Sequence, residues 1–281
     1  MIKFNNQIKY QCYFGDGTLK IENIYKYIDC TNQSINKITW LYDNDSELFT
    51  LQCLVDHIRE CRPRNLIYLE MPYIPNARQD RKVSNRLFTL KTFANIINAM
   101  NFDKVIVLDP HSDVSCALLN KLEVNYDVAW YWDERFNIND DFVYMFPDNG
   151  AAKKYSEKLL RKPTTYIIGN KHRNSEGRID SYELINFQPG TEKVVIIDDI
   201  CSFGGTYVAA AKALREQGVK QIDLVVSHCE PNIFKGDVFD YIDKVYTTDS
   251  ILDLDRFDYE LPDINVSNRI EFIKKYREIK E

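Results

Sequence analysis

The sequence predicts an α/β protein of two tandem domains, each a mainly parallel sheet flanked by helices. Apolar, strand-like segments alternate with helix-like segments in both halves of the chain. A length of 281 residues is enough for two hydrophobic cores of ordinary size. The least apolar joint lies at 133–141, so we place the boundary near residue 140 and expect domains at 1–140 and 141–281.

In the first half, strands are expected at 65–70 and 104–109, with a helix at 87–100 between them. A strand, a helix and a second strand in this order indicate a parallel pair with a right-handed crossover. In the second half, strands are expected at 164–169, 193–198 and 222–228, with a helix at 205–218 whose last residue matches a glycine C-cap.

Composition and charge restrict the function. Hydrophobic residues make up 44% and charged residues 28% of the chain, as in soluble globular proteins. Apolar runs are too short to cross a bilayer and the first residues are polar, so we expect a cytoplasmic protein without a membrane partner. A net charge of −6 argues against a nucleic-acid partner. Seven cysteines without a CxxC pair fit reduced thiols.

The segment VVIIDDICSFGGTYVAAAKAL (194–214) contains the clearest binding motif. An apolar strand is followed by two aspartates, two glycines and a threonine that could cap a helix: Asp198, Asp199, Gly204, Gly205 and Thr206. The glycines let backbone N–H groups approach an anion, whereas the carboxylates repel phosphate and suit hydroxyl groups or a metal ion. A phosphorylated sugar has both features. The alternative is a tight connection between strand and helix with solvated aspartates.

Two further polar segments follow expected strands of the first half, where ligands of α/β sheets bind. The segment ARQDRK (77–82) brings three cations together in an acidic protein, which suggests a polyanion, although a solvated charge cluster is the alternative. Asp109, His111 and Asp113 follow the next strand and could hold a divalent cation. A structural hydrogen-bonding role is the alternative for His111.

Taken together, the motifs NARQDRK, LDPHSD, FPDNGAAKKYS, NKHRN and IDDICSFGGT resemble those of ribose-phosphate pyrophosphokinases in order and spacing. The resemblance covers nearly the whole chain, from residue 14 to residue 250. The ARQDRK segment is specific, because ordinary phosphoribosyltransferases share the Asp-Asp loop and lack it. The resemblance implies two tandem phosphoribosyltransferase-like domains, the N-terminal one for nucleotide and the C-terminal one for ribose 5-phosphate.

The resemblance also implies the activity: Mg²⁺-dependent transfer of the β,γ-diphosphoryl group of ATP to the 1-hydroxyl of ribose 5-phosphate, which releases AMP. Such chemistry depends on positioning and on cations, so Mg²⁺ is the expected cofactor. ATP and ribose 5-phosphate are the expected partners, and we expect a homo-oligomer of two or more chains. One alternative is a phosphoribosyltransferase that joins a base to the activated sugar, which the 77–82 segment argues against. The other is a non-catalytic regulatory homologue, which the presence of Lys171 and His111 argues against.

The resemblance implies roles for individual residues. It places five at the nucleotide: Phe14, Asp16, Arg78, Gln79 and Asp80. It makes three catalytic, the first two on a mobile loop that closes over the phosphates: Lys171, Arg173 and His111. It places seven at ribose 5-phosphate, the aspartates at sugar hydroxyls and the others at the phosphate: Asp198, Asp199, Ser202, Phe203, Gly204, Gly205 and Thr206. It implies a metal at His111 and Asp148, with helix capping as the alternative for Asp148. Thr18 stands where the family has glutamate, and Ser202 and Phe203 replace its acidic residue and threonine.

Overall fold

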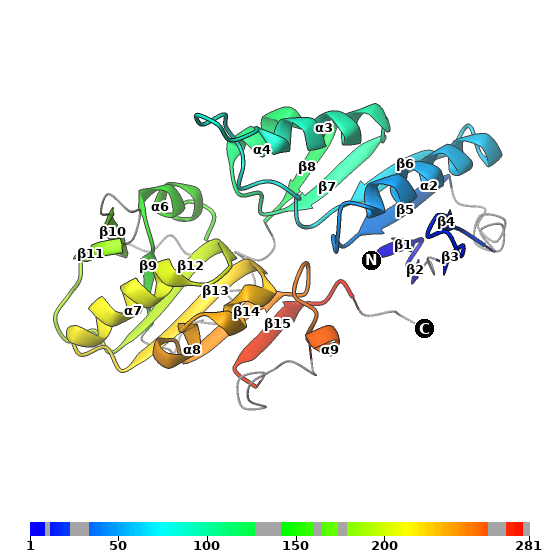
Figure 1. Cartoon of the computed structure of the whole chain (residues 1–281). Helices are drawn as coiled ribbons and strands as arrows, with labels where there is room; N and C mark the ends of the chain where they lie inside the picture. Colours follow the sequence, from blue (N-terminus) through cyan, green and yellow to red (C-terminus); the bar gives the residue numbers. More distant parts are fainter. Residues whose placement is uncertain are drawn as a thin grey trace. The chain divides into compact units, whose positions relative to one another are not determined.

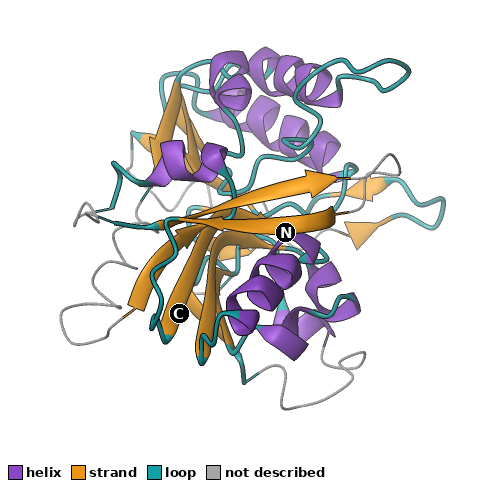
Figure 2. Ribbon diagram, turned by 90° about the vertical axis from the view of Figure 1, so that its left-hand side faces the viewer, coloured by secondary structure: helices purple, strands orange, loops and turns teal. Residues whose placement is uncertain are grey.

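The computed structural model describes residues 1–8, 12–22, 34–126, 142–159, 165–173, 179–257 and 268–277. The chain divides into two compact units (Figure 1): unit 1 comprises Met1–Asn125 and Arg277–Glu281, and unit 2 comprises Tyr126–Tyr276. Each unit contains a mainly parallel sheet with helices (Figure 2), so the predicted fold class is confirmed. The predicted boundary at residue 140 lies outside the described residues.

Unit 1 contains a six-stranded sheet in the order β2-β1-β5-β6-β7-β8. Its strands are β1 (Ile2–Phe4), β2 (Gln7–Ile8), β5 (Ile35–Trp40), β6 (Leu66–Glu70), β7 (Lys104–Leu108) and β8 (Leu122–Asn125). The strands β5 to β8 are parallel, whereas β1 and β2 pair in antiparallel fashion at one edge. The helices are α2 (Glu47–Cys61), α3 (Thr89–Ala99) and α4 (Asp113–Leu118), and a separate hairpin consists of β3 (Cys12–Tyr13) and β4 (Leu19–Lys20).

The core of unit 1 follows from strand alternation and helix periodicity. Alternate residues of β5, including Ile38 and Trp40, are fully buried against apolar residues of α2 and α3. The other face of the sheet carries polar pairs, such as Lys37 with Glu70 at 2.8 Å. One face of this sheet therefore forms the core, and both expected strands and the expected helix of the first half are confirmed.

Unit 2 contains a seven-stranded sheet in the order β11-β10-β9-β12-β13-β14-β15. Its strands are β9 (Phe142–Phe146), β10 (Ile167–Arg173), β11 (Ile179–Ile185), β12 (Lys193–Cys201), β13 (Gln221–Cys229), β14 (Lys244–Thr248) and β15 (Ile270–Lys274). Among the described strands of unit 2, only β10 and β11 pair in antiparallel fashion. The helical elements are α6 (Asn149–Tyr155), α7 (Gly205–Glu216), the 3₁₀ helix η1 (Pro231–Lys235), α8 (Val238–Tyr241) and α9 (Leu254–Phe257).

The helix α7 packs its apolar side against β12 and β13. It ends as predicted, because Gly218 has a φ of 88° and the N–H of Val219 donates to the carbonyl of Leu214 at 3.1 Å. The strand expected at 164–169 begins later, at Ile167, and continues through the polar residues to Arg173.

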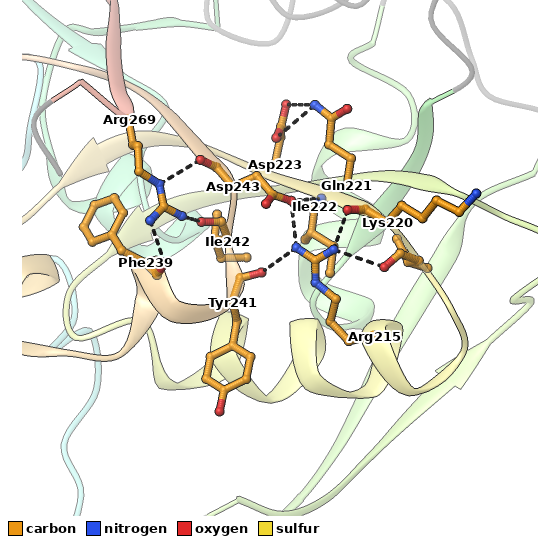
Figure 3. A network of polar contacts seen from close by, with 11 residues as sticks. Arg215, Lys220, Gln221, Ile222, Asp223, Phe239, Tyr241, Ile242, Asp243 and Arg269 are labelled. Atoms are coloured by element: carbon orange, nitrogen blue, oxygen red, sulfur yellow. Dashed lines mark hydrogen bonds and ion pairs between the residues drawn. The ribbon is translucent and has the colours of Figure 1, made fainter. Parts of the chain in front are cut away.

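Polar contacts bind the amino ends of β13 and β14 to the ends of α7 and α8 (Figure 3). The Asp243 carboxylate accepts from the N–H of Ile222 at 2.7 Å and from the Arg215 guanidinium at 2.8 Å. The guanidinium of Arg269 donates to the carbonyl oxygens of Phe239 at 2.7 Å and of Asp243 at 3.0 Å. This edge of the sheet is therefore closed by structural contacts, and the opposite, carboxyl edge carries the candidate site.

Candidate active site

Acidic and basic side chains gather at the carboxyl edge of the unit 2 sheet. Asp148 follows β9, and Asp198 and Asp199 lie near the end of the neighbouring strand β12. Lys171 belongs to β10, which pairs with the other side of β9. Because carboxyl ends of neighbouring parallel strands meet at one edge, the fold brings these predicted residues together.

Asp148 is the N-cap residue of α6 and also an ion-pair partner. Its Oδ1 accepts from the N–H of Ala151 at 3.0 Å, and its Oδ2 accepts from the Lys171 ammonium at 2.8 Å. Burial pulls the pKa of Asp148 upward, but the Lys171 bond and the backbone N–H groups outweigh it and leave the pKa below its usual value. The capping alternative is therefore confirmed, and the same carboxylate faces Lys171.

Lys171 lies inside β10, so the prediction that it lies in a loop after the strand expected at 164–169 is wrong. It pairs with Tyr182 of β11 in an antiparallel hairpin, which holds these polar residues in extended conformation. Arg173 is the last residue of β10, and its side chain lies outside the described residues, as do residues 174–178.

Gly169 and Tyr182 fit together beside this lysine. The Tyr182 hydroxyl donates to the carbonyl of Pro147 at 2.9 Å. A Cβ atom at Gly169 would lie 1.9 Å from that hydroxyl oxygen and 2.7 Å from the same carbonyl oxygen. Only glycine leaves room for this contact, which holds the residue that precedes Asp148.

The two neighbouring aspartates have different surroundings. Asp199 is 6% exposed, and its Oδ2 lies 3.0 Å from the ammonium of Lys154 in α6. Asp198 accepts from the N–H of Asp199 through Oδ1 at 2.9 Å, while its Oδ2 lies 2.9 Å from the hydroxyl oxygen of Tyr207. Burial, and then the Asp199 charge, raise the pKa of Asp198 to about 7.

Lys154 and Tyr207 contact the aspartates and were missed by the sequence analysis. Lys154 lies six residues after Asp148, and its position on the helix after the strand was the signal that could have found it. Tyr207 begins the apolar side of a helix, so its sequence context indicates only a core residue. Its hydroxyl contact depends on the three-dimensional fold.

The glycine loop turns the chain from β12 into α7. Gly204 has a φ of 75° and is the N-cap residue, and a Cβ atom there would lie 2.0 Å from Cγ2 of Val238. Both the backbone conformation and the space therefore require glycine. A Cβ atom at Gly205 would meet no atom within 4 Å, which leaves open space over the start of the helix, where backbone N–H groups lack helical partners.

Three other residues predicted to bind phosphate lie in or beside the glycine loop. Thr206 is the second residue of α7, so its predicted role as the helix cap is wrong. The Ser202 hydroxyl accepts from the side-chain amide of Asn232 at 3.4 Å. Phe203 is 54% exposed, and its carbonyl oxygen would lie 2.1 Å from a Cβ atom at Gly236. The glycine loop therefore packs against η1 and against Gly236, which follows η1.

Unit 1 has its own group of predicted residues at the carboxyl edge of its sheet. Arg78, Gln79 and Asp80 follow β6, and His111 follows β7, the parallel neighbour of β6. Both loops therefore leave the same edge, and Arg78, Gln79 and His111 are exposed. The side-chain oxygen of Gln79 accepts from the hydroxyl of Thr89 at 2.9 Å, which attaches this loop to the start of α3.

The hairpin β3–β4 carries Phe14 and Asp16 at its turn. Asp16 accepts from the N–H of Thr18 at 3.0 Å and from its hydroxyl at 2.7 Å, and these two bonds lower the pKa of Asp16. Thr18, which departs from the family pattern, therefore closes the turn. Phe14 is 53% exposed, and the ammonium of Lys20 lies 5.5 Å from its ring centroid.

Among the described residues, no three His, Cys, Asp or Glu side chains are close enough together to hold a metal ion without other ligands. None of the described helices has the length and hydropathy to cross a membrane.

The parallel sheet, with twin aspartates at a strand end and a glycine that begins the next helix, defines a phosphoribosyltransferase-type protein. The model of the phosphoribosyl transferase domain family matches residues 150–257. The phosphoribosylpyrophosphate synthetase structure from Mycobacterium smegmatis shares the fold, with a TM-score of 0.69 and 18% identity, over 95% of this chain and 85% of that chain.

Sequence relatives define the family more closely. Ribose-phosphate pyrophosphokinase 1 of Listeria monocytogenes is 32% identical over 226 residues, which are 77% of this chain and 68% of the relative. Ribose-phosphate pyrophosphokinase of Mycoplasmopsis pulmonis is 27% identical over 245 residues, which are 84% of this chain and 70% of the relative. The chain belongs to the ribose-phosphate pyrophosphokinase family and is an enzyme of that family.

Proposed function

We propose that this enzyme transfers the β,γ-diphosphoryl group of ATP to the 1-hydroxyl of ribose 5-phosphate, forming 5-phosphoribosyl 1-diphosphate and AMP. Family membership supports synthesis of phosphoribosyl diphosphate in general. The observation that supports this particular reaction is the arrangement of side chains at the carboxyl edge of the unit 2 sheet. There, the twin aspartates and the glycine loop lie beside the Lys171–Asp148 ion pair.

The hydroxyl groups and the phosphate of ribose 5-phosphate match two different parts of this edge. The carboxyl groups of Asp198 and Asp199 accept hydrogen bonds and would bind ring hydroxyls. The 5-phosphate would lie at the start of α7, where the N–H groups and the helix dipole favour an anion. No atom lies within 4 Å of a Cβ position at Gly205, and the Ser202 hydroxyl and the Phe203 N–H would add donors.

Lys171 would stabilise the charge that develops on the transferred phosphates. Its ammonium lies 2.8 Å from the Asp148 carboxylate and is only partly exposed. When substrate binds, the Lys171 ammonium would give up its contact with the Asp148 carboxylate and contact phosphate oxygens instead. Positioned cations of this kind supply much of the catalysis in phosphoryl transfer. Arg173 follows in the same strand and would act on the same phosphates.

Asp148 fits a role in Mg²⁺ binding. This ion is usually held by one or two carboxylates together with substrate phosphates, so it does not require a complete protein cage. The Asp148 carboxylate has a lowered pKa and already faces a cation, the Lys171 ammonium. When bound, Mg²⁺ would neutralise phosphate charge and hold the diphosphoryl group in place.

The nucleotide is proposed to bind at unit 1. Arg78 would neutralise phosphate charge, Gln79 and Asp80 would lie beside the nucleotide, and His111 would help to hold Mg-ATP. These residues lie on two neighbouring loops at the carboxyl edge of the unit 1 sheet. Phe14 and Asp16 would contact adenine, with the exposed Phe14 ring as a stacking surface. We also propose that the enzyme acts in the cytoplasm as a homo-oligomer.

The proposal is tested by measuring AMP in reactions of the purified enzyme with ATP, ribose 5-phosphate and Mg²⁺. AMP should form only when both substrates and the metal are present, and a chelator should stop it reversibly. Formation of AMP without ribose 5-phosphate would contradict the assignment of the acceptor. If the folded enzyme forms no AMP but joins free bases to phosphoribosyl diphosphate, it is a phosphoribosyltransferase instead.

A further inference from the structure

Tyr207 reaches from the first turn of α7 back to the end of β12. Its side chain is 3% exposed and packs in the core of unit 2, yet its hydroxyl oxygen lies 2.9 Å from Oδ2 of Asp198. The same oxygen lies 2.7 Å from the carbonyl oxygen of Ile200. The hydroxyl therefore connects the helix that follows the glycine loop with the aspartate proposed to bind the sugar.

The two contacts of this hydroxyl impose a condition on its single proton. A carbonyl oxygen can only accept, so Ile200 receives a hydrogen bond only if Tyr207 donates to it. Asp198 must then donate to Tyr207 from its neutral carboxylic acid. If Asp198 is ionised, Tyr207 donates to it and the Ile200 carbonyl loses the hydrogen bond from Tyr207. A pKa of about 7 for Asp198 makes both states accessible near neutral pH.

In both states the hydroxyl holds the same carboxyl oxygen. Oδ2 is held by Tyr207, and Oδ1 accepts from the N–H of Asp199. A carboxyl group bound at both oxygens cannot rotate freely about its terminal torsion, so its remaining lone pairs point in a fixed direction. The ammonium of Lys154 lies 3.0 Å from the other aspartate, Asp199.

We propose that Tyr207 is a positioning residue for sugar recognition, whose hydroxyl orients Asp198 toward a ring hydroxyl of ribose 5-phosphate. This inference rests on the proposed function of the edge, since it assumes that ribose 5-phosphate binds there. It adds a determinant of specificity: the orientation of Asp198 would distinguish ribose from sugars that lack the bound hydroxyl. An unpaired polar partner disfavours a ligand that lacks the matching group.

The test is equilibrium binding to the full-length enzyme by isothermal titration calorimetry, with ribose 5-phosphate and its 2-deoxy and 3-deoxy analogues. The Asp198→Asn variant first shows which deoxy analogue reports on Asp198, because discrimination against that analogue is lost. Tyr207→Phe should weaken ribose 5-phosphate binding about tenfold and reduce discrimination against the same analogue by a similar factor. Tyr241→Phe is the control: the backbone carbonyl of Tyr241 accepts from Arg215 in the last turn of α7, and loss of its hydroxyl should change neither quantity.

Wild-type discrimination in a folded Tyr207→Phe variant would overturn the inference while leaving the proposed function intact. Failure of the wild-type enzyme to bind ribose 5-phosphate would overturn both. Folding is checked by circular dichroism and thermal unfolding. Should Tyr207→Phe not fold, Asp198→Asn keeps the inference falsifiable, because the inference requires that Asp198 binds the sugar hydroxyl. Its amide can donate to the Tyr207 hydroxyl, so it should fold and lose discrimination, and retained discrimination would overturn the inference.

Discussion

Replacing Gly169 by alanine tests how the Lys171 strand is packed. The new Cβ atom would lie 1.9 Å from the Tyr182 hydroxyl oxygen and 2.7 Å from the Pro147 carbonyl oxygen, and neither distance is tolerable. The Tyr182 side chain must therefore move away from Pro147, which breaks their 2.9 Å hydrogen bond. Leaving the Pro147 carbonyl unpaired should destabilise the fold by about 1–3 kcal/mol. Strain from repacking the side chains should destabilise by about another 1–3 kcal/mol. Alanine is less flexible than glycine in the unfolded chain, which offsets about 0.5–1 kcal/mol of this loss.

The net expectation is a loss of about 2–4 kcal/mol in the free energy of unfolding of Gly169→Ala, measured by urea denaturation. Gly205→Ala is the matched control. No atom lies within 4 Å of its new Cβ, so its unfolding free energy should change by less than about 1 kcal/mol, in the stabilising direction. If Gly169→Ala were as stable as the wild type, the packing of Tyr182 described above would be refuted.

Three other changes probe the catalytic edge. Lys171→Ala should lower turnover about 10²–10³-fold with little change in stability, whereas Lys220→Ala, an exposed lysine at the other edge of the sheet, should retain activity; near-wild-type turnover of Lys171→Ala would exclude the catalytic assignment. Gly204→Ala should destabilise by about 2–4 kcal/mol, because φ is 75° and Val238 blocks the Cβ, and Val238→Ala should restore only the steric part; full restoration would contradict the backbone argument. Asp198→Asn should raise the midpoint of thermal unfolding relative to the wild type as pH increases from about 4 to 7. The folded pKa of Asp198 is about 7 and its ordinary value is 3.8, so the wild type carries a loss of stability from this group over that range that the variant lacks; a pH-independent difference would argue against a raised pKa.

The parts of the fold that depend on local patterns could be predicted from the sequence. Continuous β-branched runs, such as 194–197, identify buried parallel strands, and the aspartates and glycines that follow are adjacent in the chain. The helix 205–218 could be predicted because a glycine with positive φ ends it in the expected way. In these cases sequence neighbours are also spatial neighbours.

Other features depend on contacts that the sequence order hides. The polar residues up to Arg173 were expected in a loop, but pairing with β11 holds them in a strand. The predicted cap at Thr206 was wrong because the left-handed conformation of Gly204 starts the helix two residues earlier. Lys154 reaches Asp199 across 45 positions, a contact that only the packing of α6 beside β12 creates.

The central claim is that the enzyme transfers a diphosphoryl group rather than a single phosphoryl group. The most direct test is ³¹P NMR of the products formed from ATP, ribose 5-phosphate and Mg²⁺. The proposed function predicts AMP and a sugar with two coupled phosphorus signals from the diphosphate at C1, together with the unchanged 5-phosphate signal. ADP with a sugar carrying a single additional phosphate would contradict the claim.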